Sequence, residues 1–312
     1  MSFIPFTNTR KKRGSVKALS FRTHLLDVAV LITVSAALGY IFHKVSTSLN
    51  YLWDFGAILD YVYYYTEDGS FRSGVILQGF VTTIRLSIWA GILGTILGIT
   101  MGLFRTSKSL YKRLLGKTYV GFVRNTPPLV LIFIFYFFIG DQILPLLGLD
   151  DALYTLEGFW KTVLEVVAGP IEQVPAFTSA VLTLAIFEGA YITEIVRAGI
   201  TAVDSGQWEA AKSQGLSRRQ QLQKVIIPQA FRFMIPPLTG QYISVIKDSS
   251  IVSVISIQEL TFQGMEVMAG TYKTFEIWII ITALYFCMTF ACSRLAKKVE
   301  TKMQLPGYNN GL

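Results

Sequence analysis

Six long apolar runs dominate this sequence of 312 residues. They occupy approximately residues 25–42, 79–104, 119–140, 176–196, 233–257 and 277–293. About 20 residues of helix cross the roughly 30 Å hydrocarbon layer of a bilayer, where each backbone polar group must be hydrogen-bonded within the protein. Each run therefore predicts a spanning helix, and the chain is predicted to be an all-α, polytopic transmembrane bundle. A content of 52% hydrophobic and only 15% charged residues argues against a water-soluble globule.

The connections between the runs alternate in charge. Lysine and arginine predominate in residues 1–24, 105–117, 197–232 and 294–298, whereas acids predominate in residues 43–78, 141–175 and 259–276. By the positive-inside rule, this alternation predicts that both termini are cytoplasmic, namely a basic N-terminus at 1–24 and a tail at 299–312. The protein itself is predicted to lie in the cell inner membrane. Because the bases are divided among several loops, no nucleic-acid partner is expected.

The first run has two possible interpretations. A secretory signal is one, because basic residues precede the run and Ser35-Ala36-Ala37 could be a weak cleavage site. Charge alone does not decide, but five further runs favour an uncleaved anchor, so residues 25–78 are assigned to an additional N-terminal helix and an external loop. Cys287 and Cys292 lie five positions apart in the last run, on different helical faces, so neither a disulfide nor a metal site is expected.

One basic connection carries a spaced sequence pattern. Residues 204–228 read DSGQWEAAKSQGLSRRQQLQKVIIP, in which Glu-Ala-Ala is followed by three residues, a glycine, nine residues and Val-x-Ile-Pro. The residues that form the pattern are Glu209, Ala210, Ala211, Gly215, Leu216, Val225, Ile227 and Pro228. The pattern resembles the EAA loop of membrane subunits of ATP-binding-cassette importers, in which EAA, three residues, glycine and nine residues precede Ile-x-Leu-Pro.

Further segments resemble the polar amino acid branch of the same family. They are RNTPPL from Arg124, GAYITEIVRAGI from Gly189 and KDSSIVSVISIQEL from Lys247. The resemblance covers about residues 74–298, and the permease domain is assigned to 79–298. It implies five core helices of a type I importer permease, to which this chain adds one N-terminal helix.

The resemblance also implies partners. In the family the loop docks on a separate ATP-binding-cassette ATPase, which uses ATP and Mg, so this chain is expected to bind no cofactor itself. A second permease chain, identical or related, would complete the pore, and an extracytoplasmic solute-binding protein would deliver a polar amino acid.

The loop can also be interpreted without the family. A short helix beginning near Gln207, with Glu209 in its first turn and a left-handed Gly215 at its end, would form a compact knob on the inner surface. Trp208 would supply apolar contacts and Arg218 would belong to a charged rim. A helix–turn–helix lying on lipid headgroups is the alternative. The spaced match favours docking.

No catalytic arrangement is apparent in the sequence. Gly116-Lys117-Thr118 matches the end of a phosphate-binding loop, but Tyr111 occupies the position of the required glycine. His24 and His43 flank the first run, which favours solvated ends over a metal site. We therefore expect a transport subunit that is not an enzyme, with ATP hydrolysis in a partner.

Ionisable residues within the runs are candidates for a pathway, because a charge at bilayer depth costs about 2.5 to 3.5 kcal/mol on insertion scales. Glu194 and Arg197 are three residues apart, which predicts a structural ion pair. Adjacent helical residues point about 100° apart, so Lys247 and Asp248 cannot pair well, and one should reach another helix or the pore.

An amino acid carries an ammonium and a carboxylate, which Glu188 and Tyr191 on one helix and Lys247 on another could complement. The family usually has a small residue at the position of Glu188. The glutamate in this chain departs from that pattern, and it indicates either cationic substrates or an ion pair particular to this chain. The predicted pathway residues are therefore Glu188, Tyr191, Lys247 and Asp248. Charges that only lock helices together remain the alternative.

Other features predict packing and surfaces. Gly91, Gly94, Gly98 and Gly102 favour close helix packing within the chain over a mobile contact with a partner. Pro236 and Pro237 predict a kink in the fifth run. Residues 156–167 form an amphipathic segment that could support a solute receptor, and residues 61–65 favour an interfacial aromatic belt over a recognition patch.

Two other function classes remain open. A membrane scaffold or sensor without a pore would bind no ATPase, and substitutions at Glu209 or Gly215 would have no effect on uptake. An ion-driven transporter would show inverted repeats, and no internal duplication is apparent.

Overall fold

The computed structural model describes residues 14–48, 51–146, 148, 153 and 155–303. The predicted cytoplasmic tail at 299–312 lies largely outside these residues, as do Arg10 to Arg13 of the basic N-terminus. The chain divides into two compact units, residues 1–54 and 55–312. In the first, α1 (Gly14–Ser48) is followed by Trp53, whose ring stacks on Phe42 and whose indole N–H donates to Ser46 Oγ at 2.6 Å.

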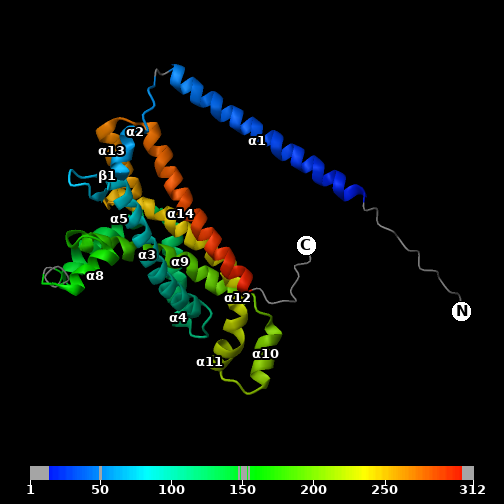
Figure 1. The fold of residues 1–312 in the computed structure, drawn as a ribbon. Coiled ribbons are helices and arrows are strands. Elements are labelled where there is room, and N and C mark those ends of the chain that lie inside the picture. The colour runs from blue at the N-terminus through cyan, green and yellow to red at the C-terminus, as the bar shows by residue number, and fades with distance from the viewer. Residues whose placement is uncertain (1–13, 49–50, 147, 149–152, 154, 304–312) are drawn as a thin grey trace. The chain divides into compact units, whose positions relative to one another are not determined.

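The second unit is a helical bundle with one short hairpin (Figure 1). Its helices and strands are α2 (Gly56–Val62), β1 (Tyr63–Tyr65), β2 (Phe71–Ser73), α3 (Val75–Arg105), α4 (Leu110–Asn125), α5 (Pro128–Phe138), α6 (Leu144–Leu146), α8 (Phe159–Ala168), α9 (Val174–Thr201), α10 (Ser205–Ser213), α11 (Arg218–Gln221), α12 (Ile227–Asp248), α13 (Leu260–Thr271) and α14 (Thr274–Met303). Short π-helical turns span Ile139–Ile143 and Leu222–Ile226, and 3₁₀ turns span Ile171–Gln173 and Ser249–Ile255. The helical bundle is confirmed, whereas the hairpin was not predicted.

Fewer helices than predicted have the length and hydropathy of a membrane span. Among the described residues these are Leu26–Ser48, Val75–Arg105, Ile171–Thr201 and Thr274–Thr301. α4 and α5 qualify only as a bent pair, with 116° between them, and would supply a fifth. The single helix predicted over 119–140 is instead two helices, because Thr126 is extended before Pro127 and Pro128, where a helix cannot continue.

The fifth run also differs from its prediction. Regular helix ends at Asp248 and a 3₁₀ turn follows to Ile255, so residues 233–257 are not one helix. Pro236 and Pro237 lie inside α12, which continues through them as one element, and the kink stays a prediction.

Close packing of α3 on α9 forms the centre of the bundle. A Cβ added to Gly98 would lie 2.5 Å from Ile192 Cγ2, and one added to Gly102 would lie 2.6 Å from Val196 Cβ. Only glycine lets the two backbones approach this closely. The predicted intrachain role of the glycine stripe is confirmed here. α9 is accordingly the most enclosed span, with 72% of its apolar window buried.

The bundle has two distinct ends. Figure 1 shows α10 and α11 projecting from one end, here called the loop end, while α2, β1 and α13 lie at the other, here called the hairpin end. At the hairpin end Ile58 of α2 packs in a buried cluster with Leu260 of α13 and Ile277 of α14. α13 therefore belongs to the core, although residues 259–276 were predicted to be an external loop.

Candidate functional site

The EAA segment forms a short helix at the loop end. α10 begins at Ser205 because the side chain of Asp204 caps it, with Oδ1 accepting the backbone N–H of Gly206 at 2.7 Å. The helix thus starts two residues earlier than predicted, and its first turn contains no acid, so the predicted first-turn position of Glu209 is wrong. Gly215 has φ of +77°, which is the left-handed end that the sequence predicts.

α10 has an inward and an outward face. Ala211 is buried, whereas Ala210 and Glu209 are exposed. Trp208 packs on a cluster that contains Val203 and Ile226, which joins the loop to α9 and to the start of α12. The loop is therefore fixed to the bundle through Trp208, while Glu209 and Ala210 are open to solvent.

Arg218 contributes more than the predicted charged rim. Its guanidinium lies 3.6 Å from the centroid of the Trp208 ring, a cation–π contact between α11 and α10. Burial against the protein lowers the pKa of Arg218 from its ordinary value. A capping box between Ser217 and Gln220 defines the start of α11. The cation–π contact joins the two short helices into one knob.

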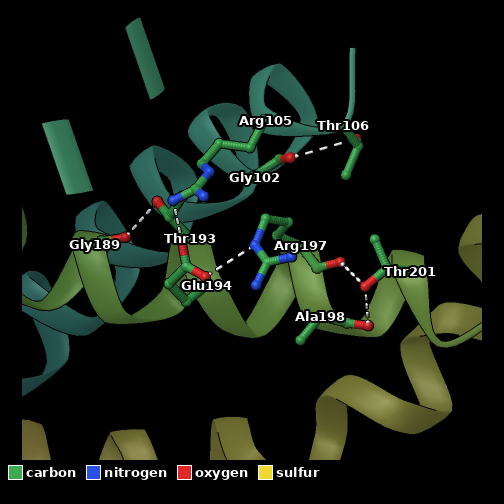
Figure 2. Close-up of polar contacts among 9 residues, drawn as sticks. All are labelled: Gly102, Arg105, Thr106, Gly189, Thr193, Glu194, Arg197, Ala198 and Thr201. Atoms are coloured by element: carbon green, nitrogen blue, oxygen red, sulfur yellow. Dashed lines mark hydrogen bonds and ion pairs between the residues drawn. The ribbon is translucent and has the colours of Figure 1, made fainter. Parts of the chain in front are cut away.

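Figure 2 shows an ion-pair cluster between α3 and α9. The predicted pair is present, with Arg197 Nε donating to Glu194 Oε2 at 2.9 Å. The other carboxylate oxygen, Oε1, is paired with Arg105 of α3. The sequence analysis missed Arg105, although it follows Gly102 by three residues and so continues the glycine stripe that faces α9. One carboxylate thus joins the ends of α3 and α9.

A cavity of about 700 Å³ opens between this cluster and the knob. Arg105 and Arg197 line it from the bundle, and Trp208, Glu209 and Arg218 line it from the knob. A change in the position of α10 would alter this cavity directly.

The predicted pathway residues separate into three places. Glu188 of α9 is fully buried, and its Oε2 accepts a hydrogen bond from Gln241 of α12. Its Oε1 has no hydrogen-bond partner among the described residues. Asp248 lies about two helical turns after Gln241 on α12, and its carboxyl group interacts electrostatically with that of Glu188. Gln241, which the sequence analysis missed, therefore joins α12 to the buried carboxylate of Glu188 on α9.

Lys247 and Tyr191 have other neighbours. Lys247 lines a cavity of about 290 Å³ with Thr261 of α13 and Thr282 of α14. Tyr191 lies about one turn after Glu188 on α9, where its ring packs on Phe187 and the guanidinium of Arg124 lies 5.3 Å from its ring centroid. Asp248 faces Glu188 of α9, whereas Lys247 faces α13 and α14. This separation agrees with the angle of about 100° between adjacent residues of a helix.

A second buried acid lies at the hairpin end. Glu259 caps α13 by accepting the backbone N–H of Phe262 at 2.8 Å, and it also accepts the Tyr285 hydroxyl at 2.7 Å and the Thr83 hydroxyl at 3.3 Å. Because all these donors converge on one buried carboxylate, Glu259 joins α3, α13 and α14. Its sequence position in a supposed external loop gave no sign of this role.

Neither a nucleotide loop nor a metal cluster is found in the described part of the chain. Gly116 and Lys117 lie within α4, so the segment is a helix and not a phosphate-binding loop. Within residues 14–48, 51–146, 148, 153 and 155–303, no group of three or more His, Cys, Asp or Glu side chains could hold a metal ion.

Comparison with known proteins finds a family match that includes the EAA segment. Residues 94–305 match the family described as "Binding-protein-dependent transport system inner membrane component". The glutamine transport system permease protein GlnP of Escherichia coli is 30% identical over 231 residues, which are 74% of this chain and 94% of that protein. The octopine transport system permease protein OccM of Rhizobium radiobacter is 29% identical over 76% of this chain and 89% of that protein.

Solved structures give a consistent result. A structure described as an amino acid ABC transporter with histidines is 31% identical, with a TM-score of 0.62 over 81% of this chain and 100% of that chain. The MetNI methionine ABC transporter has a similar fold, with a TM-score of 0.56 at 13% identity.

Proposed function

The chain belongs to the family of binding-protein-dependent transport system inner membrane components, and on that premise we propose that it carries a polar amino acid and is driven by an ATPase bound to α10. It is a permease subunit of an importer, embedded as a multi-pass protein in the inner membrane. The observation that carries the proposal is the EAA spacing, which lies on a capped helix with a buried Ala211 and an exposed Glu209.

In this proposal the loop end faces the cytoplasm. Residues 197–232 hold six bases against two acids, and the positive-inside rule assigns such segments to the cytoplasmic side. Both termini would then be cytoplasmic, and the hairpin end would face the extracytoplasmic binding protein.

The knob would act as a lever. ATP and Mg would bind in the partner ATPase, whose movement would displace α10. The Arg218–Trp208 contact would keep α10 and α11 together, and Glu194 would transmit the displacement to α3 and α9 at once. A pore shared with a second permease chain, identical or related, would then open alternately to the two sides.

The substrate contact we propose involves Glu188, Gln241 and Asp248. A buried carboxylate oxygen without a hydrogen-bond partner, such as Glu188 Oε1, is costly unless a ligand satisfies it. Two carboxyl groups in one contact favour a cation, so the substrate would present an ammonium or guanidinium group there. Lys247 and Tyr191 would act elsewhere on the path, since each lies against other helices.

The docking part is tested by Gly215→Val. Valine strongly disfavours the φ of +77° at this position, so the end of α10 should be disrupted and the ATPase should no longer copurify. Gly69→Val is a matched control, because Gly69 has the same φ of +77° but lies at the hairpin end. Equal ATPase binding by both variants, at normal expression, would refute the docking role of α10. Loss in both variants would show a general folding defect, which purification yield and thermal unfolding would also report.

The substrate part is tested by Glu188→Gln in uptake assays with L-arginine and L-glutamine. We expect the preference for L-arginine to fall about tenfold, equivalent to about 1.4 kcal/mol. Lys247→Met should reduce uptake of both amino acids and leave their ratio unchanged. Unchanged rates and selectivity in both variants would exclude these residues from the pathway while leaving the docking proposal intact.

A further inference from the structure

The β1–β2 hairpin presents an aromatic face. Tyr63 pairs with Ser73, Tyr64 with Arg72 and Tyr65 with Phe71 in antiparallel register. Because side chains alternate across a strand, Tyr63, Tyr65 and Phe71 share one face, and Tyr64 and Arg72 share the other. The three rings of the first face lie 6.1 to 6.2 Å apart between centroids.

This face is uncovered in the second unit. Tyr63, Tyr65 and Phe71 are 39%, 68% and 57% exposed. Leu59 on the preceding helix α2 is also exposed, which extends the apolar surface. Three packed aromatic rings that remain open to water are unfavourable unless another apolar phase covers them.

The hairpin is held at the level where two spans begin. The Gly74 amide donates to the Val62 carbonyl at 2.8 Å, and α3 starts at the next residue. Ile58 of α2 packs in one buried cluster with Ile277, in the first turn of α14. Both spans are longer than the roughly 20 residues that cross the hydrocarbon, so helix ends such as these reach the headgroup region, and this packing holds the aromatic face there.

The turn of the hairpin is polar and separate from the rings. The Thr66 amide donates to the Ser70 carbonyl at 3.0 Å, and Gly69 supplies the positive φ that the turn requires. Hydrogen bonds from Thr66 and Ser70 lower the pKa of Asp68, so the turn stays charged at neutral pH. The ribbon therefore has an apolar face on its strands and an ionised tip.

We propose that the face of Tyr63, Tyr65 and Phe71 binds the lipid headgroup region and anchors the start of α3 in the bilayer interface. Tyrosine suits this region because its ring is apolar and its hydroxyl can reach water or headgroups. The charged tip would then point into water. The inference does not depend on the solute that is carried.

The test compares two neighbouring positions. Tyr65→Cys and Tyr64→Cys are made with Cys287 and Cys292 replaced by serine, labelled with an environment-sensitive fluorophore, and reconstituted in phosphatidylcholine–phosphatidylglycerol nanodiscs. Tyr64 is the matched control, because it belongs to the same short strand but points the other way.

We expect headgroup-labelled nitroxide lipid to quench the probe at 65 more strongly than the probe at 64, and iodide to show the reverse order. Equal iodide quenching at both positions with no lipid quenching would overturn the proposal. Protection of the probe at 65 from iodide without quenching by the nitroxide lipid would also overturn it, because a protein, such as a second copy, would then cover the face. A hairpin that unfolded would give equal quenching at 64 and 65 and would count against the proposal, so near-identical thermal unfolding of the two labelled proteins is verified first.

Discussion

Glu194→Gln removes the carboxylate that two guanidinium groups share at the loop end. The pair with Arg105 is mostly enclosed, with 20% and 19% of the side chains exposed, whereas Arg197 is 37% exposed. Hydrogen bonds to charged groups contribute about 1.5 to 3 kcal/mol, and exposed pairs about 0.2 to 1 kcal/mol. The first range applies to Arg105 and the second to Arg197, so we expect a loss of about 2 to 4 kcal/mol in the free energy of unfolding.

A double-mutant cycle measures this interaction. Glu194→Gln, Arg105→Gln and the double variant are unfolded by denaturant in mixed micelles. Because the two residues contact each other, the double variant should cost about 1 to 2 kcal/mol less than the sum of the single variants. Glu209→Gln is the control, since Glu209 is exposed and should change stability by no more than about 0.5 kcal/mol.

The same variants separate stability from coupling. If Glu194 transmits motion from α10 to α3 and α9, receptor-stimulated ATP hydrolysis in Glu194→Gln should persist while uptake per ATP falls. Additive costs in the cycle would refute the energetic reasoning. Unchanged uptake per ATP would refute the transmission role even if the cycle showed coupling.

Two further predictions concern packing. Gly98→Ala should destabilise the protein by about 1 to 3 kcal/mol, because the new Cβ would meet Ile192. Gly121→Ala is the control and should be neutral or slightly stabilising in thermal unfolding, because nothing lies within 4 Å of a Cβ there. Equal unfolding temperatures of the two variants would contradict close packing of α3 on α9. Glu259→Ala should cost about 3 kcal/mol or more, because three donors lose a buried acceptor, and hydrogen exchange should increase at the start of α13; unchanged exchange there would show that the cap is dispensable.

The sequence was informative wherever the relevant interactions are local. Apolar length predicted the spans at α1, α3, α9 and α14, and the spacing of three predicted the pair of Glu194 with Arg197. The left-handed Gly215 followed from glycine chemistry alone. Each of these features depends on residues within a few turns of one segment, so it can be predicted from the sequence of that segment.

Errors arose where breaks and caps compete with hydropathy. The apolar run 119–140 reads as a continuous span, but two consecutive prolines bend it by 116°. Asp204 moved the start of α10 by two residues, because a side-chain cap outweighs the weak helix preference of the residues that follow. The β1–β2 hairpin is too short to give a clear alternating pattern.

Sequence by itself determined the class of the protein, four of its candidate spans and the spacing of the EAA segment, because these depend on composition, local periodicity and spacing. The tertiary structure alone decided that Arg105 joins Glu194, that Gln241 joins Glu188, and that Lys247 faces α13 and α14. Contacts between helices depend on the rotation of each helix about its axis and on how the helices cross. Hydropathy encodes neither quantity when a helix is apolar on nearly all sides, so these contacts appear only once the bundle is assembled.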